Sequence, residues 1–219
     1  MRALVTGGTG RLGSAIAARL ERDGWRVVRA GRADANIADV DEARRLVARA
    51  AEELGGLDLL VNAAGDGFEP RPFEELDEAA WDAAFGATAK GSFFVTQAAA
   101  PHLRASRGCV VMIEDVAAYQ PWPSFAAHCA AKAAQAMLTR VLARALAPDA
   151  RVCGVVPGPL AVAPGQEERR AAETLLGRVG SPDDVAAAVA YLAGADFVTG
   201  STLVVDGGRL LQTGRPTGA

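Results

Sequence analysis

The sequence predicts a doubly wound α/β fold, in which one parallel sheet is covered by helices on both faces. Short apolar segments alternate with longer segments of helical periodicity along the chain, and a glycine-rich segment follows the first of them. Strands that alternate with helices form parallel sheets because each crossover helix packs on a face of the sheet. Half of the 219 residues are hydrophobic, and we find no internal repeat and no linker. We therefore expect a single domain over residues 1–219, with residues 210–219 as a loose tail.

Six of the apolar segments have the length and the composition of buried strands. The first, Ala3–Thr6, begins almost at the first residue. The others are expected at Trp25–Arg29, Leu57–Val61, Val110–Ile113, Val152–Val156 and Thr202–Val205.

Helices are expected between these strands. Leu12, Ile16 and Leu20 recur at a spacing of four, which places them on one face of a helix. A second helix over Asp39–Leu54 is opened by an acidic cap and closed by two glycines. Further helical patterns lie at Ala79–Phe85, Gly91–Ala105, Phe125–Ala147 and Asp183–Leu192.

Charge and composition exclude several classes of function. The net charge is −3, without a basic stripe for nucleic acid or a polybasic segment for an anionic membrane. No apolar stretch is long enough to span a bilayer, and the chain enters a strand too early for a signal peptide. Cys109, Cys129 and Cys153 form no paired framework, and the two histidines do not cluster with them. We therefore expect a cytoplasmic protein with reduced thiols and no metal site.

A phosphate-binding loop is expected directly after the first strand. The segment Thr6-Gly7-Gly8-Thr9-Gly10-Arg11-Leu12-Gly13 leads straight into a helix. Its glycines let the backbone approach a pyrophosphate, and the helix N-terminus presents free N–H groups to it. Between a strand and a helix at the start of an α/β chain, this pattern indicates a Rossmann-type dinucleotide site. Gly7, Gly10, Arg11, Leu12 and Gly13 are the expected contacts, and a purely structural turn is the alternative.

The second strand favours NADP(H) as the dinucleotide. An NAD site requires a carboxylate near the end of this strand for the ribose diol, but no acid occurs before Asp34. Arg11, Arg29 and Arg32 are expected to converge on this corner, where a guanidinium matches a 2′-phosphate. The alternative is that these arginines are only solvated surface.

Further segments resemble one enzyme family over essentially the whole chain. They are Asn62-Ala63-Ala64-Gly65, Lys90-Gly91-Ser92-Phe93-Phe94, Pro157-Gly158, Gly180–Val185 and Val205–Gly208. Together they are similar to the motifs of the short-chain dehydrogenases/reductases. The resemblance implies cofactor contacts at Asn62, Ala63, Gly65, Pro157 and Gly158. It also places Asn36-Ile37 where an Asp-Val pair lines the adenine pocket.

Within that family the chain looks most similar to the pteridine-reductase branch. There the glycine loop ends in Arg-Leu-Gly, as in Arg11-Leu12-Gly13, and an aspartate replaces the usual serine, as Asp115 does here. Pro164-Gly165 also resembles that branch. The catalytic tetrad nevertheless departs from the family pattern, because His128 occupies the tyrosine position and Thr88 the asparagine position. Of the usual four residues only Lys132 remains.

His128 and Lys132 lie four residues apart on the expected helix and therefore on one face. A histidine acts as a general acid near neutral pH. The hypothesis is an NADPH-dependent reductase of a small carbonyl or cyclic imine, in which His128 donates the proton, Asp115 orients it and Lys132 holds the cofactor ribose. One alternative is a silent member that binds cofactor as a partner subunit. Another uses Asp115 and His128 for acid–base chemistry without redox.

Other expectations concern aromatic residues and assembly. Phe68 is a candidate to stack on a flat substrate and Trp122 to cap the same cleft, whereas Tyr119 is more typical of the surface. The helices at Gly91–Ala105 and Phe125–Ala147 are apolar on more than one side, so one face of each needs a partner. We therefore expect a homodimer or homotetramer, since the family uses these helices for assembly.

Overall fold

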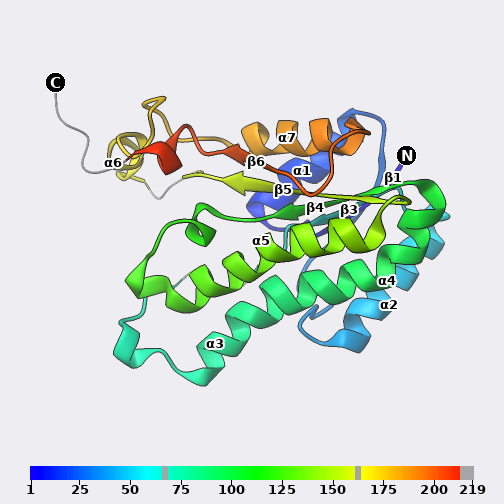
Figure 1. The fold of residues 1–219 in the computed structure, drawn as a ribbon, viewed down its shortest axis with the longest axis horizontal. Helices are drawn as coiled ribbons and strands as arrows, with labels where there is room; N and C mark the ends of the chain where they lie inside the picture. Colours follow the sequence, from blue (N-terminus) through cyan, green and yellow to red (C-terminus); the bar gives the residue numbers. More distant parts are fainter. Residues whose placement is uncertain (66–68, 161–163, 213–219) are drawn as a thin grey trace.

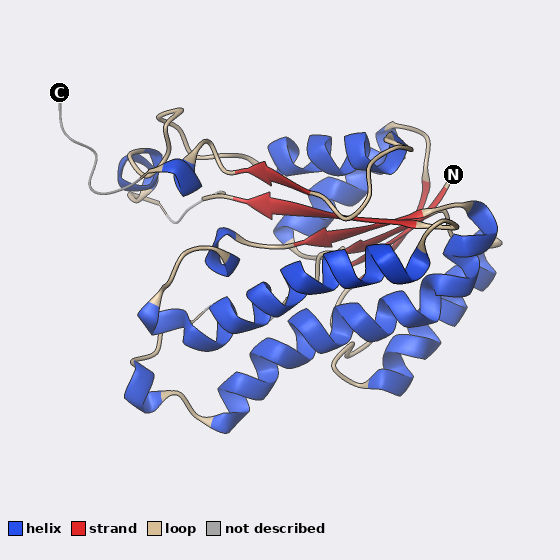
Figure 2. Cartoon of the chain, viewed as in Figure 1, coloured by secondary structure: helices blue, strands red, loops and turns tan. Residues whose placement is uncertain are grey.

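The computed structural model describes residues 1–65, 69–160 and 164–212, and its centre is a six-stranded sheet in which all neighbouring strands are parallel (Figures 1 and 2). The strand order is β2-β1-β3-β4-β5-β6. The strands are β1 Arg2–Thr6, β2 Arg26–Ala30, β3 Leu59–Asn62, β4 Cys109–Ile113, β5 Arg151–Pro157 and β6 Thr202–Val205.

Helices cover both faces of the sheet, as Figure 1 shows, and each face has its own hydrophobic core. On one face lie α2 (Val40–Leu54), α4 (Gly91–Ser106) and α5 (Ala126–Leu146). On the other lie α1 (Arg11–Arg22) and α7 (Pro182–Gly194). The fold class expected from the sequence is therefore confirmed.

The expected elements all occur, with ends that differ by a few residues. Several features were not anticipated, among them the following. A π-helical segment, Gly86–Lys90, joins α3 (Glu78–Phe85) to α4, and a short helix, α6 (Glu167–Ala171), precedes α7. Within the segment expected to be loose, Leu210 and Leu211 belong to a 3-10 helix, Arg209–Leu211, whereas residues 213–219 lie outside the described part.

Helix ends follow local sequence chemistry. Asp39 caps α2 by accepting hydrogen bonds from the N–H groups of Asp41 and Glu42, both at 2.9 Å. Gly55 ends that helix with φ of 75°, a left-handed conformation that glycine adopts without steric cost. Ser181 and Asp184 form a reciprocal capping box at the start of α7. No helix in the described part of the chain is long and apolar enough to cross a membrane.

The sheet order places a topological switch between β1 and β3. From β1 the chain moves outward to β2, returns to β3 on the other side of β1, and continues outward to β6. Helices that follow β1 and β3 therefore lie on opposite faces, and a crevice opens at the carboxyl ends of these strands. The residues predicted for cofactor binding and for chemistry follow the ends of β1, β2, β3, β4 and β5.

Candidate functional site

Two of the cavities at the carboxyl edge of the sheet are lined by predicted site residues. The first, here the glycine-loop cavity, has a volume of about 600 Å³, and the second, the His128 cavity, about 790 Å³. Ala63 and Gly65, which follow β3, line both of them. An extended ligand that passes over these two residues would therefore reach from one cavity into the other.

The glycine loop is held in a tight turn. The Gly8 N–H donates to the Ala30 carbonyl at 2.9 Å, and the Gly10 N–H donates to the Gly7 carbonyl at 3.0 Å. Gly7 has φ of 67°, and a Cβ there would lie 2.7 Å from the Ala63 carbonyl oxygen. A Cβ on Gly13 would overlap the Gly7 carbonyl oxygen. Backbone atoms therefore exclude a side chain at Gly7 and at Gly13, which lets the loop keep the tight turn that a phosphate-binding loop requires.

The three arginines expected to converge at the ribose corner point to three different places. Arg32 lines the glycine-loop cavity with Asn36 and Ile37. Arg11 instead lines the His128 cavity. Arg29 forms hydrogen bonds to Glu21 on α1, at 3.0 and 2.5 Å, so the expectation that it joins Arg32 is wrong. Sequence proximity could not separate these directions, because Arg32 lies beyond the end of β2 and the alternation of side chains along a strand does not apply to it.

His128, Asp115 and Lys132 line the same cavity. His128 Nε2 lies 3.4 Å from Asp115 Oδ2, and Asp115 Oδ1 accepts the Ala117 N–H at 2.8 Å. Burial raises the pKa of Asp115, but the His128 contact, the Ala117 N–H and the positive charge of Lys132 outweigh it. The net shift of the pKa is downward, so Asp115 is ionised at neutral pH.

Lys132 is almost fully buried. Its Nζ donates to the Ile113 carbonyl at 2.7 Å and to Gln135 Oε1 at 3.0 Å, and Gln135 Nε2 donates to Ser92 Oγ at 2.9 Å. Burial lowers the pKa of Lys132, whereas Asp115 and Glu114 act in the opposite direction. A hydrogen-bond network that spans α4, β4 and α5 thus holds the Lys132 side chain in place at the cavity.

Glu114 is a buried acid that the sequence analysis missed. Only 1% exposed, it accepts hydrogen bonds from Thr139 at 2.7 Å, Tyr119 at 3.1 Å and Thr202 at 3.2 Å. Burial raises its pKa, although these donors oppose the shift. The space comes from Gly154 on β5, since a Cβ there would overlap Glu114 Oε1. Tyr119, expected at the surface, is 47% exposed and is anchored by this bond.

Asn62 and Thr88 lie deeper than the cavity linings. Asn62 Nδ2 donates to Thr96 Oγ1 at 3.0 Å, and neither Asn62 nor Thr88 lines the two cavities. Among the described residues, Asn62 Oδ1 and Thr88 Oγ1 are buried atoms with no hydrogen-bond partner. Thr88 belongs to the π-helical segment, a deviation that is frequent at functional sites.

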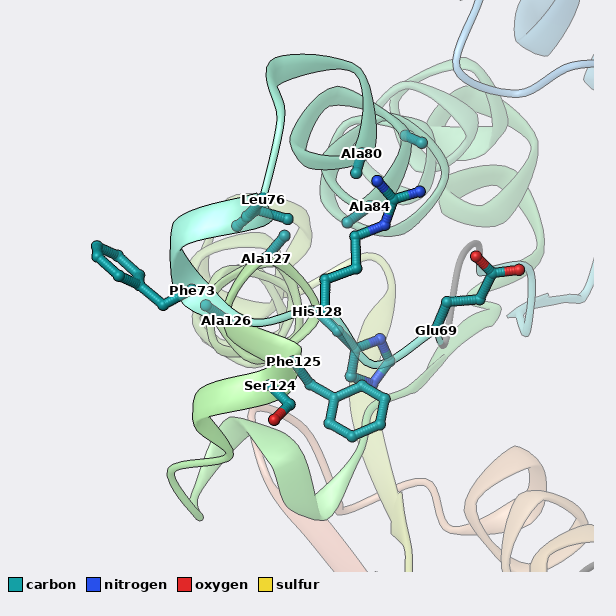
Figure 3. A pocket seen from close by; sticks show the side chains of 12 residues that line it. Glu69, Phe73, Leu76, Ala80, Ala84, Ser124, Phe125, Ala126, Ala127 and His128 are labelled. Atoms are coloured by element: carbon teal, nitrogen blue, oxygen red, sulfur yellow. The ribbon is translucent and has the colours of Figure 1, made fainter.

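His128 also borders a third cavity, of about 220 Å³, between the 69–84 segment and the start of α5. Figure 3 shows the side chains of His128, Phe125 and Glu69 reaching into this α3 cavity from different segments. His128 therefore borders both the His128 cavity and the α3 cavity.

Most other predicted residues line the His128 cavity. They are Leu12, Ala63, Gly65, Pro157, Gly158 and Trp122. Phe68 lies outside the described residues. Gln166, Arg170 and Arg209 also line the cavity, and none of them was predicted. They follow no recognisable motif, and only the folded chain brings them to the site.

Comparison with known proteins identifies the family. Residues 17–209 match the family model described as enoyl-(acyl carrier protein) reductase. The 3beta-hydroxysteroid dehydrogenase 1 of Eggerthella lenta is 33% identical, with 96% of this chain and 94% of that protein covered. The human dehydrogenase/reductase SDR family member 4 is 32% identical, over 94% of this chain and 86% of that protein.

A solved structure agrees with these relatives. The short-chain dehydrogenase from Burkholderia cenocepacia, determined in complex with NADP, has a TM-score of 0.86 and 31% identity, covering 95% of this chain and 97% of that one. Together with the parallel sheet and the glycine loop, these matches show that the chain belongs to the short-chain dehydrogenase/reductase family of NAD(P)-binding oxidoreductases.

Proposed function

We propose that this protein is an NADPH-dependent reductase of a small, flat carbonyl or cyclic imine substrate, with His128 in the role of the proton donor. The observation that carries the proposal is the contact between His128 Nε2 and Asp115 Oδ2, at 3.4 Å, in a cavity that also holds Lys132. An NADPH oxidation assay on ketones, quinonoid pterins and cyclic imines tests it. Inertness of the wild-type protein on all three classes would contradict it.

The described residues fit a dinucleotide. Gly7, Gly10 and Gly13 form a cradle that a Cβ would fill, and the N-terminus of α1 points its N–H groups there. Asn36 and Ile37 would contact the adenine, and Lys132 the nicotinamide ribose. Ala63, Gly65, Pro157 and Gly158 would line its path. A bound NADPH supplies the hydride.

His128 would protonate the anion that develops on the substrate. Ionised Asp115 stabilises the imidazolium and fixes the ring, while Lys132 contributes positive charge. After turnover the imidazole regains a proton from water that reaches it through the α3 cavity, because that cavity borders His128 even when substrate fills the other. The Arg11-Leu12-Gly13 end of the loop and Asp115 support a pteridine-reductase-like member with a degenerate tetrad.

Acid–base chemistry without redox is the second candidate. The contact between Asp115 and His128 favours it, because a carboxylate–imidazole pair can move protons in dehydration or isomerisation without any hydride. A catalytically silent partner subunit is the remaining alternative, and the loss of the family's tyrosine and asparagine favours it. Turnover in the NADPH assay decides against both.

The position of Arg32 predicts the choice of cofactor. Arg32→Ala should reduce the preference for NADPH over NADH by about tenfold to a hundredfold, because a charge-assisted contact is worth roughly 1.5–3 kcal/mol. Fluorescence titration with both cofactors measures it. Arg29→Ala is a matched control that should leave the ratio unchanged, since Arg29 is engaged by Glu21. Equal affinities of the wild type for the two cofactors would refute the argument.

The outer face of α5 predicts assembly into a homodimer or homotetramer. Met137 and Val141 lie one turn apart on this helix and are 54% and 50% exposed. Burial of such a face against a second copy would remove apolar area from water. Light scattering at micromolar concentration should show an oligomer, and Val141→Arg should shift it toward the monomer. Leu176→Arg, which changes an exposed leucine outside α5, is the control and should leave the oligomer intact. A monomeric wild-type protein would contradict the expectation.

A further inference from the structure

Two arginines from the C-terminal part of the chain lie in the wall of the His128 cavity. Arg170 belongs to α6 and Arg209 begins the 3-10 helix after β6. Glu173 bridges them, because its carboxylate accepts from Arg170 Nη1 at 3.1 Å and from Arg209 Nη1 at 2.6 Å. The side chain of Arg209 is only 13% exposed, so it is held in place rather than solvated.

The charges of this wall do not balance. One carboxylate, Glu173, serves two guanidinium groups. The other acids of the cavity are engaged elsewhere, since Asp115 contacts His128 and the Ala117 N–H, and Glu114 accepts from three hydroxyl groups beneath the floor. Within the described ranges, Nη2 of Arg170 and Nη2 of Arg209 have no acceptor. A positive charge and several N–H donors therefore remain for a ligand.

An aromatic surface accompanies these donors. The guanidinium of Arg209 lies 5.1 Å from the centroid of the Trp122 ring, and its Nε donates to Gln120 at 3.3 Å. Trp122 lines the same cavity as His128. A flat molecule that packs against the Trp122 indole would thus have the guanidinium donors at one end, and the His128 imidazole would lie in the same cavity.

We infer that the substrate carries an oxyanion, a carboxylate or a phosphate, which Arg170 and Arg209 bind while the reacting carbon faces His128. The inference rests on the proposed reductase function and specifies its substrate class. A guanidinium pair binds such a group by charge-assisted hydrogen bonds that a neutral ester does not offer. Arg170 and Arg209 line the His128 cavity, which Arg11 and Leu12 also border, but they do not line the glycine-loop cavity, where the ribose corner of the cofactor is expected.

Paired probes test the inference without turnover. Titration calorimetry on protein saturated with NADP⁺ compares benzoylformate with methyl benzoylformate, and phenyl phosphate with phenol. We expect the anion of at least one pair to bind about tenfold to a hundredfold more tightly than its neutral partner. The pair that shows the larger ratio identifies carboxylate or phosphate as the preferred group.

Variants assign the effect to the two arginines. Arg170→Met should abolish the preference, and Arg209→Lys, which keeps the charge but loses the planar fork, should reduce it. Glu173→Gln should raise the preference for the anion several-fold, because the competing carboxylate is removed. If these residues had only a structural role, this variant would not bind the anion more tightly. Arg169→Met is the control, since Arg169 belongs to the same helix but does not line the His128 cavity. It lines a second cavity, which Arg170 and Arg209 also border, so a preference lost in this variant would place the anion there instead. Melting curves confirm that each variant is folded.

Three outcomes would overturn the inference. The first is equal binding of the anion and its neutral partner. The second is a preference for the anion that survives both Arg170→Met and Arg209→Lys. The third is anion binding that NADP⁺ abolishes, which would mean that the arginines bind the phosphates of the cofactor. Failure of the reductase proposal is distinguishable. In that case the anion preference persists with NADP⁺ bound, while no substrate causes NADPH oxidation.

Discussion

His128→Ala is expected to lower the rate of reduction by about 10²–10⁴-fold, the usual contribution of a positioned general acid. The affinity for NADPH should stay nearly unchanged, because the contacts proposed for the cofactor come from the glycine loop, the adenine pocket and Lys132 rather than from His128. Stopped-flow measurement of NADPH oxidation gives the rate, and fluorescence titration gives the affinity. His102→Ala, at the other histidine of the chain, is the matched control and should retain the wild-type rate.

The same mechanism predicts the sign of the pH dependence. The pKa of Asp115 is lowered, so its negative charge persists to acidic pH. The rate should therefore fall through protonation of Asp115 only below the pH range in which an aspartate usually titrates. His128→Tyr should restore a pH profile typical of the family. Turnover that survives His128→Ala would end the proposal and direct attention to a bound water as the acid.

Gly13→Ala is expected to lower the affinity for NADPH by about tenfold to a hundredfold and the stability by roughly 1–3 kcal/mol. The added Cβ would overlap the Gly7 carbonyl oxygen and lie 2.7 Å from the Gly7 carbonyl carbon. Both are backbone atoms, so the loop itself must move and would lose the hydrogen bond from the Gly10 N–H to Gly7. Cofactor titration and urea unfolding measure the two effects.

Gly194→Ala provides the comparison. Gly194 is the last residue of α7, and no atom would lie within 4 Å of a Cβ there. Replacing this glycine should leave cofactor affinity unchanged and should change stability by less than about 1 kcal/mol. If Gly13→Ala behaved in the same way, the glycine loop would not be the cofactor cradle.

The fold was predictable because its signals are local. Alternating strand and helix patterns predict a sheet covered by helices, and the glycine loop is recognisable from eight consecutive residues. The pairing of His128 with Asp115 was also expected, since the helix spacing to Lys132 and the offset to Asp115 suggested it. The π-helical segment at Gly86–Lys90 was not, because neither hydrophobic period nor capping residues distinguish it from a continuous helix.

The remaining features depend on the directions of side chains and on distant segments. Arg29 and Arg32 lie three residues apart, yet one binds Glu21 and the other lines a cavity. Glu114 is accommodated only because Gly154, on another strand, leaves room. Arg170 and Arg209 meet at Glu173 from two separate segments. Such contacts leave no periodic trace in a single sequence.

The all-parallel sheet has a consequence for how the site comes into existence. No strand pair of the described six-stranded sheet can form as a hairpin, because each pair needs an intervening crossover, and topologies of this kind fold slowly. The bond from Arg209 to Gln120 joins residues 89 apart in the sequence, and it requires β6 to be docked. The His128 cavity is therefore complete only when the last strand has joined the sheet. A dinucleotide that spans both ends of the crevice would recognise only the finished molecule and, at a hundred times its dissociation constant, would add about 2.7 kcal/mol to its stability.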